Sequence, residues 1–258
     1  MREDLLSILI NPYSGNNLQL EDGSLVDLGT GERFSIQNGI PVILREQEVE
    51  GLNRLYQRRY DWLSYFYDFM AARLGPFFGA DKVFGQIAES MDVRPGDWML
   101  ETSIGTGQQV ANLLKHGKVA ERVIGLDISM GMLRRCLRNA RRWPAAPDLV
   151  QGNAETVPFS DETFDMVFHI GGINFFSDKE RAVLEMIRVA KPGARLYIGD
   201  ETEKLLEKQP SVVNRYYQKA DTGLYAPPLE FIPDSVEEVE NQYLWDGKMY
   251  LISFRKPL

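Results

Sequence analysis

The sequence predicts an α/β fold with a mostly parallel sheet, and two observations carry that prediction. From Asp97 onward, short apolar runs alternate with helical patterns, which is typical of βαβ units. Turn-rich short runs precede this region, and two strand-like runs around Trp245-Asp246-Gly247 follow it. We therefore expect a small N-terminal β domain, a parallel sheet with helices, and a C-terminal antiparallel hairpin.

Residues 1–47 contain apolar stretches broken by turn formers such as Asn11-Pro12 and Asp22-Gly23. This punctuation predicts small β-hairpins. A domain of this size must rely on its neighbour for stability, because it cannot bury enough apolar surface alone.

Residues 48–92 have a helical pattern that is rich in aromatic side chains. Core packing against the sheet explains most of them. Their concentration between Tyr56 and Phe69 also suggests a lid over an apolar acceptor. From this lid we assign Tyr60 and Tyr65 to the active site.

Residues 93–258 hold the predicted sheet. Its expected strands are Trp98–Glu101, Arg122–Asp127, Asp148–Gln151, Phe164–Ile170 and Arg195–Asp200, with hairpin strands Glu237–Leu244 and Lys248–Arg255. Helices fill the intervals. Ser177-Asp178-Lys179-Glu180 is typical of a capping box that opens a helix, and Lys191-Pro192-Gly193 ends that helix.

The composition limits the function classes. The net charge of −8 argues against a nucleic-acid partner, because phosphate binding draws on clustered cations. With Cys136 as the only cysteine and two histidines, neither a disulfide framework nor a cysteine zinc site can form, and we expect no metal. We expect a cytoplasmic protein, since the start lacks a signal-peptide pattern and no apolar run approaches about 18 residues.

A small-residue turn, Glu101-Thr102-Ser103-Ile104-Gly105-Thr106-Gly107, follows the first parallel strand and opens a helix. Such a turn lets a ligand approach the backbone and the free N–H groups of the helix. The third glycine of a dinucleotide-binding G-x-G-x-x-G is replaced by Val110. Asp127 ends the second strand, where a carboxylate can accept ribose hydroxyl protons. These features favour a nucleoside ligand without a diphosphate.

Four segments resemble, in order and spacing, the motifs of class I S-adenosylmethionine-dependent methyltransferases. They are Glu101 to Gly107, Asp127, Gly152-Asn153-Ala154-Glu155 and Phe164-Asp165-Met166-Val167. The resemblance covers roughly residues 93 to 200 and is closest to the menaquinone and ubiquinone C-methyltransferase branch. It implies a Rossmann-like class I methyltransferase fold, S-adenosyl-L-methionine as cofactor, and methyl transfer to a small, apolar or aromatic metabolite through a carbon, oxygen or nitrogen acceptor.

The resemblance also implies roles for individual residues. The implied cofactor-binding set is Glu101, Ser103, Gly105, Gly107, Asp127, Ile128, Met132, Asn153, Ala154 and His169. Ser103 departs from the family pattern, which has the first loop glycine there. A lone histidine near a strand end is more often structural, but His169 would suit a general base if the acceptor must lose a proton. Asn174 would orient a substrate oxygen or cap a turn.

The N-terminal segment resembles the short zinc-ribbon domains attached to or activating some methyltransferases. Asn11 and Ser14, and residues near Gly29, stand where that family has paired cysteines. The resemblance therefore implies the ribbon backbone without zinc.

Two other functions remain open. One is an RNA-base methyltransferase resembling the zinc-ribbon rRNA guanine methyltransferases, and the other is a non-catalytic scaffold that binds the cofactor. The expected partner is a small-molecule substrate, with no membrane span, and a homo-oligomer is left open.

Overall fold

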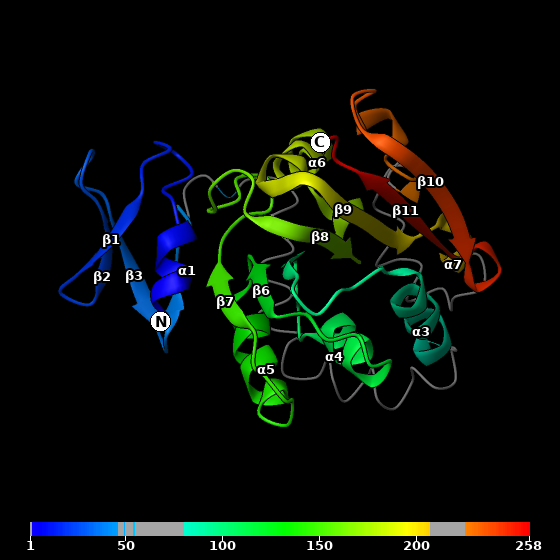
Figure 1. The fold of residues 1–258 in the computed structure, drawn as a ribbon, viewed down its shortest axis with the longest axis horizontal. Helices are drawn as coiled ribbons and strands as arrows, with labels where there is room; N and C mark the ends of the chain where they lie inside the picture. Colours follow the sequence, from blue (N-terminus) through cyan, green and yellow to red (C-terminus); the bar gives the residue numbers. More distant parts are fainter. Residues whose placement is uncertain (1, 46–48, 50–53, 55–79, 207–224) are drawn as a thin grey trace.

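The computed structural model describes residues 2–45, 49, 54, 80–206 and 225–258. Within them, the strands form a four-stranded sheet ordered β1-β2-β3-β4 and a seven-stranded sheet ordered β10-β11-β9-β8-β5-β6-β7. Figure 1 shows the small sheet at one end of the molecule, beside β7 of the large sheet. The predicted α/β architecture is confirmed. In the described part of the chain, no helix is long and apolar enough to cross a membrane.

Five parallel strands form the centre of the large sheet. They are β5 (Trp98–Thr102), β6 (Arg122–Asp127), β7 (Asp148–Gln151), β8 (Phe164–Ile170) and β9 (Ala190–Glu201). All five were predicted, but β9 begins before the expected Arg195, because Ala190 pairs with Phe164 directly after the preceding helix. The chain runs outward from β5 to β7 and then returns to β8 on the other side of β5. Such a reversal of strand order opens a crevice at the carboxyl ends of the strands.

The predicted C-terminal hairpin is also confirmed. It consists of β10 (Glu237–Leu244) and β11 (Met249–Arg255), joined by the short turn η5 (Trp245–Gly247). All three turn residues have positive φ. β11 lies between β10 and β9 and is antiparallel to both.

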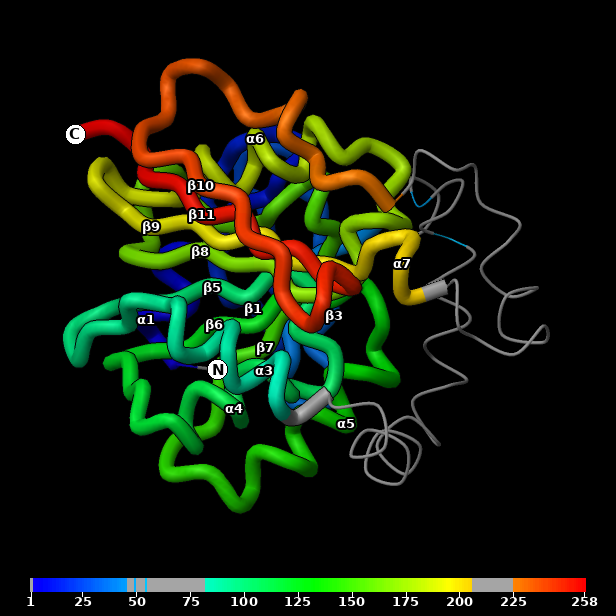
Figure 2. The backbone as a smooth tube through the Cα atoms, turned by 90° about the vertical axis from the view of Figure 1, so that its right-hand side faces the viewer, coloured from blue at the N-terminus to red at the C-terminus, as the bar shows by residue number. Residues whose placement is uncertain are grey.

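Helices cover both faces of the large sheet, as Figures 1 and 2 show. They are α3 (Ala80–Ser90), α4 (Gln108–Lys115), α5 (Met130–Ala140) and α6 (Lys179–Val189). Side chains of α3, α4 and α5 share one buried cluster with Met99, Phe168 and Leu251, whereas α6 packs into another with Leu196 and Ile198. The sheet faces alternate accordingly, with successive strand residues in opposite clusters.

The capping box predicted at Ser177 is shifted by one residue. Asp178 is the N-cap of α6, and its carboxylate accepts the backbone N–H of Arg181 at 2.9 Å. An aspartate is as good a cap as a serine, so the sequence pattern fits either start.

The N-terminal segment forms a short helix and an antiparallel sheet. These are α1 (Glu3–Ile8), β1 (Leu18–Glu21), β2 (Ser24–Asp27), β3 (Arg33–Gln37) and β4 (Ile40–Pro41). The hairpins expected beyond residue 17 are confirmed, but a helix occupies residues 3–8. Leu5 in this helix and Leu9 directly after it are both buried.

The small sheet is bonded directly to the large one. Val42 forms a parallel bridge with Gln151, and the Ile43 N–H donates to the Gln151 carbonyl at 2.8 Å. The Ser160 N–H donates to the Ile8 carbonyl at 2.9 Å. Buried side chains of both parts form a single hydrophobic cluster. The N-terminal domain therefore packs on the β7 edge, as expected for a domain too small to stand alone.

The Asp27 carboxylate joins the two turns of the N-terminal domain that the zinc-ribbon resemblance aligns with cysteines. It accepts hydrogen bonds from Asn11 Nδ2 at 2.8 Å, Ser14 Oγ at 2.6 Å and Asn16 Nδ2 at 3.0 Å, and from the N–H groups of Gly29 and Thr30. These bonds hold the pKa of Asp27 well below its usual range, with the Ser14 hydroxyl as the largest cause. Among the described residues, no group of three or more His, Cys, Asp and Glu is placed to hold a metal ion.

The predicted lid lies mostly outside the described residues. Tyr60 and Tyr65 are both outside them, so their assignment to the active site stays a prediction. The described end of this region is α3, which confirms a helix there.

We expect Asp27→Asn to lower the melting temperature at pH 7, because an amide cannot accept all these hydrogen bonds. Since folding lowers the pKa of Asp27, its stabilisation is complete above the unfolded pKa of about 3.9 and declines as the pH falls through the folded value. The melting curves of the variant and the parent should therefore converge in acid. Asp22→Asn, in an exposed turn with positive φ, is the matched control. A difference in melting temperature that is constant from pH 7 to pH 3 would contradict this account.

Candidate functional site

The turn between β5 and α4 has an unusual backbone. Ser103, Gly105 and Gly107 have φ values of +65°, +57° and +80°. Glycine adopts this left-handed conformation without strain, whereas serine pays a cost of about 1 kcal/mol. The predicted ligand loop therefore folds back on itself at the carboxyl end of β5, even though serine replaces a glycine.

Packing requires glycine at two positions below this turn. An added Cβ at Gly107 would lie 2.5 Å from the Trp143 ring and 2.9 Å from Cys136 Sγ. An added Cβ at Gly125 on β6 would lie 2.4 Å from Ile104. At Gly105, by contrast, an added Cβ would have no atom of the described residues closer than 4.0 Å. The turn is thus tightly packed toward the core and open at Gly105, as a ligand-binding loop must be.

Asp127 connects this turn to the end of β6. Its Oδ2 accepts the Gly105 N–H at 2.8 Å, and its Oδ1 accepts the Ser129 N–H at 2.8 Å. Ser129 in turn caps α5 by accepting the Met132 N–H. A carboxylate is an acceptor of the kind that the hydroxyls of a ribose require.

Glu101 is a buried carboxyl at the carboxyl end of β5. Its side chain is 2 % exposed, and Oε2 has no hydrogen-bond partner among the described residues. Burial, together with the charge of Asp127, raises the pKa of Glu101 well above its usual value. An unpaired buried carboxyl is costly, so a cationic ligand group at this place would be stabilising.

The residues implied for adenine lie at the ends of β6 and β7. Asp127 pairs with Gln151 in the parallel register, and Gln151 Nε2 donates to the Ile128 carbonyl at 3.0 Å. Asn153 Oδ1 accepts the Glu155 N–H at 3.0 Å, which fixes the turn after β7. Ala154 and Met132 are both buried. The structure therefore brings the adenine-binding candidates to adjacent strand ends, next to Asp127.

His169 lies inside the core at the end of β8. It is fully buried, its Nδ1 is 3.3 Å from Thr102 Oγ1, and its ring packs edge-on against Phe176. Burial lowers its pKa to about 4, so the imidazole is neutral at pH 7. Its Nε2 has no partner among the described residues. These contacts favour a structural or ligand-facing neutral histidine, and its catalytic role stays a prediction.

Asn174 lies in the short turn η2 (Ile173–Phe175) after β8 and is fully buried. Its amide donates to the Glu201 carbonyl at 2.9 Å, and its N–H donates to the Asp200 carboxylate at 2.9 Å. The same carboxylate accepts the Gly172 N–H at 3.0 Å. These bonds give Asn174 a turn-fixing role, which was one of its two predicted readings.

Two further acidic residues, which the sequence motifs did not indicate, lie at this edge of the sheet. Asp200 is the buried acceptor that fixes the β8 turn, and burial raises its pKa. Burial and the neighbouring Asp200 also raise the pKa of Glu201 to about 8. Asp200 ends a predicted strand, as Asp127 does, and Glu201 directly follows it, so that position was the available signal.

Comparisons with known proteins agree with this geometry. Residues 100–198 match the family model described as a methyltransferase domain. The chain is 32% identical over 130 residues to a demethylmenaquinone methyltransferase of Corynebacterium kroppenstedtii, covering 50% of this chain and 53% of that protein. It is 33% identical over 153 residues to the ubiquinone/menaquinone biosynthesis C-methyltransferase UbiE of Pasteurella multocida, covering 58% and 56%. The chain thus spans about half the length of these curated relatives.

A solved structure extends the likeness to the fold. A SAM-dependent methyltransferase from Thermotoga maritima superposes with a TM-score of 0.56 at 20% identity, covering 75% of this chain and 97% of that chain. The Rossmann-like methyltransferase fold expected from the sequence is therefore confirmed.

Replacing Gly107 with alanine should destabilise the protein by about 2 kcal/mol or more, because the methyl group meets Trp143 and the backbone is left-handed. Gly117→Ala is the matched control, since Gly117 has a φ of +69° with nothing within 4 Å. That variant should lose only the backbone part, about 1 kcal/mol. Urea unfolding followed by circular dichroism measures both. Equal losses would show that packing does not restrict the loop.

Proposed function

We propose that this chain is an S-adenosylmethionine-dependent methyltransferase that acts on a small, apolar or aromatic metabolite. The observation that carries the proposal is the hydrogen bond from the Gly105 N–H to Asp127, which joins the open turn after β5 to a carboxylate at the end of β6. This arrangement suits a nucleoside that extends along the turn.

Several polar groups would hold the cofactor. Asp127 would accept hydrogen bonds from the two ribose hydroxyls. Glu101, whose buried Oε2 has no partner among the described residues, would accept a hydrogen bond from the cationic amino group. The remaining assignments follow the resemblance: Ser103, Gly105 and Gly107 beside the methionine part, and Ile128, Met132, Asn153 and Ala154 around adenine. When bound, the cofactor supplies a methyl group that its sulfonium makes electrophilic.

The chain contributes position and exclusion of water. Holding donor and acceptor at attack distance contributes up to roughly 7 to 11 kcal/mol in the best model systems. The turn Gly171–Phe175, fixed by Asp200, would form the side of the site next to β8. His169 would remain a neutral imidazole there, able to accept or donate one hydrogen bond.

The substrate class is proposed from the relatives. Two of them are named for demethylmenaquinone or for ubiquinone and menaquinone biosynthesis, so a quinol ring is the first acceptor to test.

The net charge of −8 gives no support to the RNA alternative. No described contact favours the scaffold alternative. The zinc-ribbon likeness of residues 1–47, a cytoplasmic location and a homo-oligomer stay proposals.

Asp127→Asn should weaken binding of S-adenosylhomocysteine roughly 10- to 100-fold, because hydrogen bonds to a charged group contribute about 1.5 to 3 kcal/mol. Isothermal titration calorimetry measures the affinity. The control is Asp165→Asn, a carboxylate at the opposite end of the sheet that accepts the Trp98 N–H and pairs with Lys191. Equal affinities for the two variants would reject the assignment of Asp127.

Methyl transfer itself can be tested with labelled cofactor and three acceptors: a demethylated naphthoquinol, a small-molecule extract, and RNA. We expect a small-molecule product heavier by one methyl group. Label in RNA would favour the nucleic-acid alternative. Tight cofactor binding with no labelled product would favour the scaffold.

A further inference from the structure

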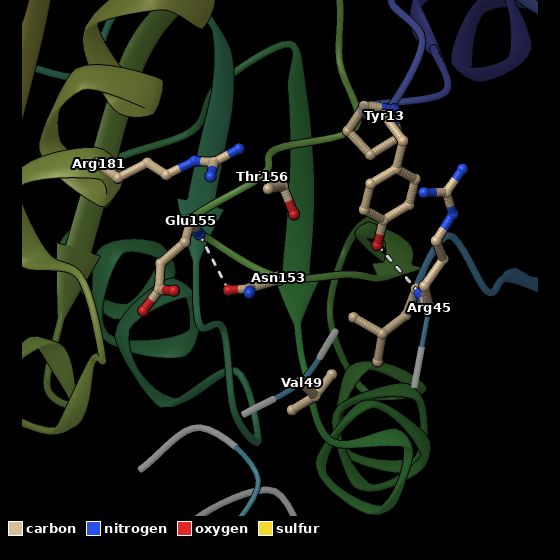
Figure 3. A pocket seen from close by; sticks show the side chains of 9 residues that line it. Tyr13, Arg45, Val49, Asn153, Glu155, Thr156 and Arg181 are labelled. Carbon is tan, nitrogen blue, oxygen red and sulfur yellow. Dashed lines mark hydrogen bonds between the residues drawn. The ribbon is translucent and has the colours of Figure 1, made fainter. Parts of the chain in front are cut away.

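A pocket of about 320 Å³ lies between the N-terminal domain and the loop after β7 (Figure 3). Tyr13 and Arg45 line it from the N-terminal domain, and Asn153 and Thr156 line it from the opposite side. Arg181 of α6 also lines it and extends toward it from the left in this view. The pocket is therefore a junction between two parts of the chain that are far apart in sequence.

This junction borders the proposed cofactor site. The bridge between Val42 and Gln151 is parallel, so the residues that follow each of them run in the same direction past the carboxyl edge of the sheet. Arg45 comes three residues after Val42, and Asn153 comes two residues after Gln151. Asn153 is one of the residues proposed to hold adenine, and it lines the pocket. The pocket thus lies at the adenine end of that site.

The N-terminal wall of the pocket is held rigidly. Arg45 donates to both carboxylate oxygens of Glu32 at 2.8 Å. Its guanidinium lies 3.9 Å from the centre of the Tyr13 ring, and its backbone N–H donates to the Tyr13 hydroxyl at 3.0 Å. Asn11 connects Glu32 to the Asp27 cluster. Pre-organised side chains lose little entropy when a ligand binds.

The charges around the pocket compensate each other. Glu32 neutralises Arg45 in a bidentate pair, and the pocket holds Glu155 as well as Arg181. Phosphate recognition needs an excess of donors and positive charge. A neutral heterocycle needs a flat apolar surface and a few polar groups at its edge, which Tyr13, Asn153 and Thr156 offer.

We propose that the N-terminal domain completes the cofactor site: Tyr13, held in place by Arg45, forms the outer wall against which the adenine base packs. This inference rests on the proposed function, since it assigns the base of the same cofactor. It makes Tyr13 and Arg45 of the N-terminal domain part of the binding site, so the cofactor affinity depends on them.

The affinity test uses S-adenosylhomocysteine and calorimetry on the full chain. Tyr13→Ala should weaken binding about tenfold, the usual effect of losing an aromatic wall against a base. Tyr13→Phe keeps the ring and should bind within about twofold of the parent. Arg33→Ala, in an exposed ion pair with Glu21 of the same small sheet, should leave affinity unchanged.

A photolabel on the parent chain gives an independent readout that needs no variant to fold. S-(2-azidoadenosyl)homocysteine should label the peptide that contains Tyr13 or the one that contains Arg45. Labels confined to other peptides, with Tyr13→Ala binding like the parent, would overturn the inference while leaving the proposed function intact. Failure of the parent chain to bind S-adenosylhomocysteine would overturn both.

Discussion

The Asp127 carboxylate accepts a hydrogen bond from one backbone N–H in each of the two loops that follow β5 and β6. The rest of the site depends on this pair of hydrogen bonds. Through Gly105 the carboxylate sets the position of the left-handed turn, and through Ser129 it sets the start of α5. Its negative charge also helps to raise the pKa of Glu101, the unpaired carboxyl below the turn. One residue therefore shapes the loop and prepares its neighbour for a cationic group.

The large sheet explains why the site lies where it does. β5 and β8 are neighbours, but the chain continues from β5 to β6 on one side and from β8 to β9 on the other. Neither connection therefore covers the carboxyl edge between β5 and β8. The N-terminal domain extends the same sheet beyond β7 through the Val42 and Gln151 bridge. Because the bridge is parallel, the extension brings Arg45 and Tyr13 to that edge as well. A small appendage thereby becomes a wall of the proposed binding region.

Local patterns were enough to predict the parallel strands, the hairpin, the tight turn after β5 and the position of Asp127 at the end of β6, because each depends on residues close together in sequence. The start of the chain was harder, since a short apolar run such as Leu5 to Ile10 fits a helix or a strand equally well. The pocket wall and the role of Asp200 depend on contacts between distant residues: Val42 with Gln151, and Asp200 with Gly172. No sequence periodicity reports such contacts. The burial of His169 is likewise a property of packing, which a strand-end position does not reveal.

A crystal structure with bound S-adenosylhomocysteine would show whether Asp127 holds a ribose. We predict ribose hydroxyls within hydrogen-bond distance of the Asp127 carboxylate, with the amino group of the ligand beside Glu101 and the chain of the ligand crossing Gly105. A ligand bound elsewhere, or a turn that closes over Asp127 and leaves no room for a ribose, would contradict it.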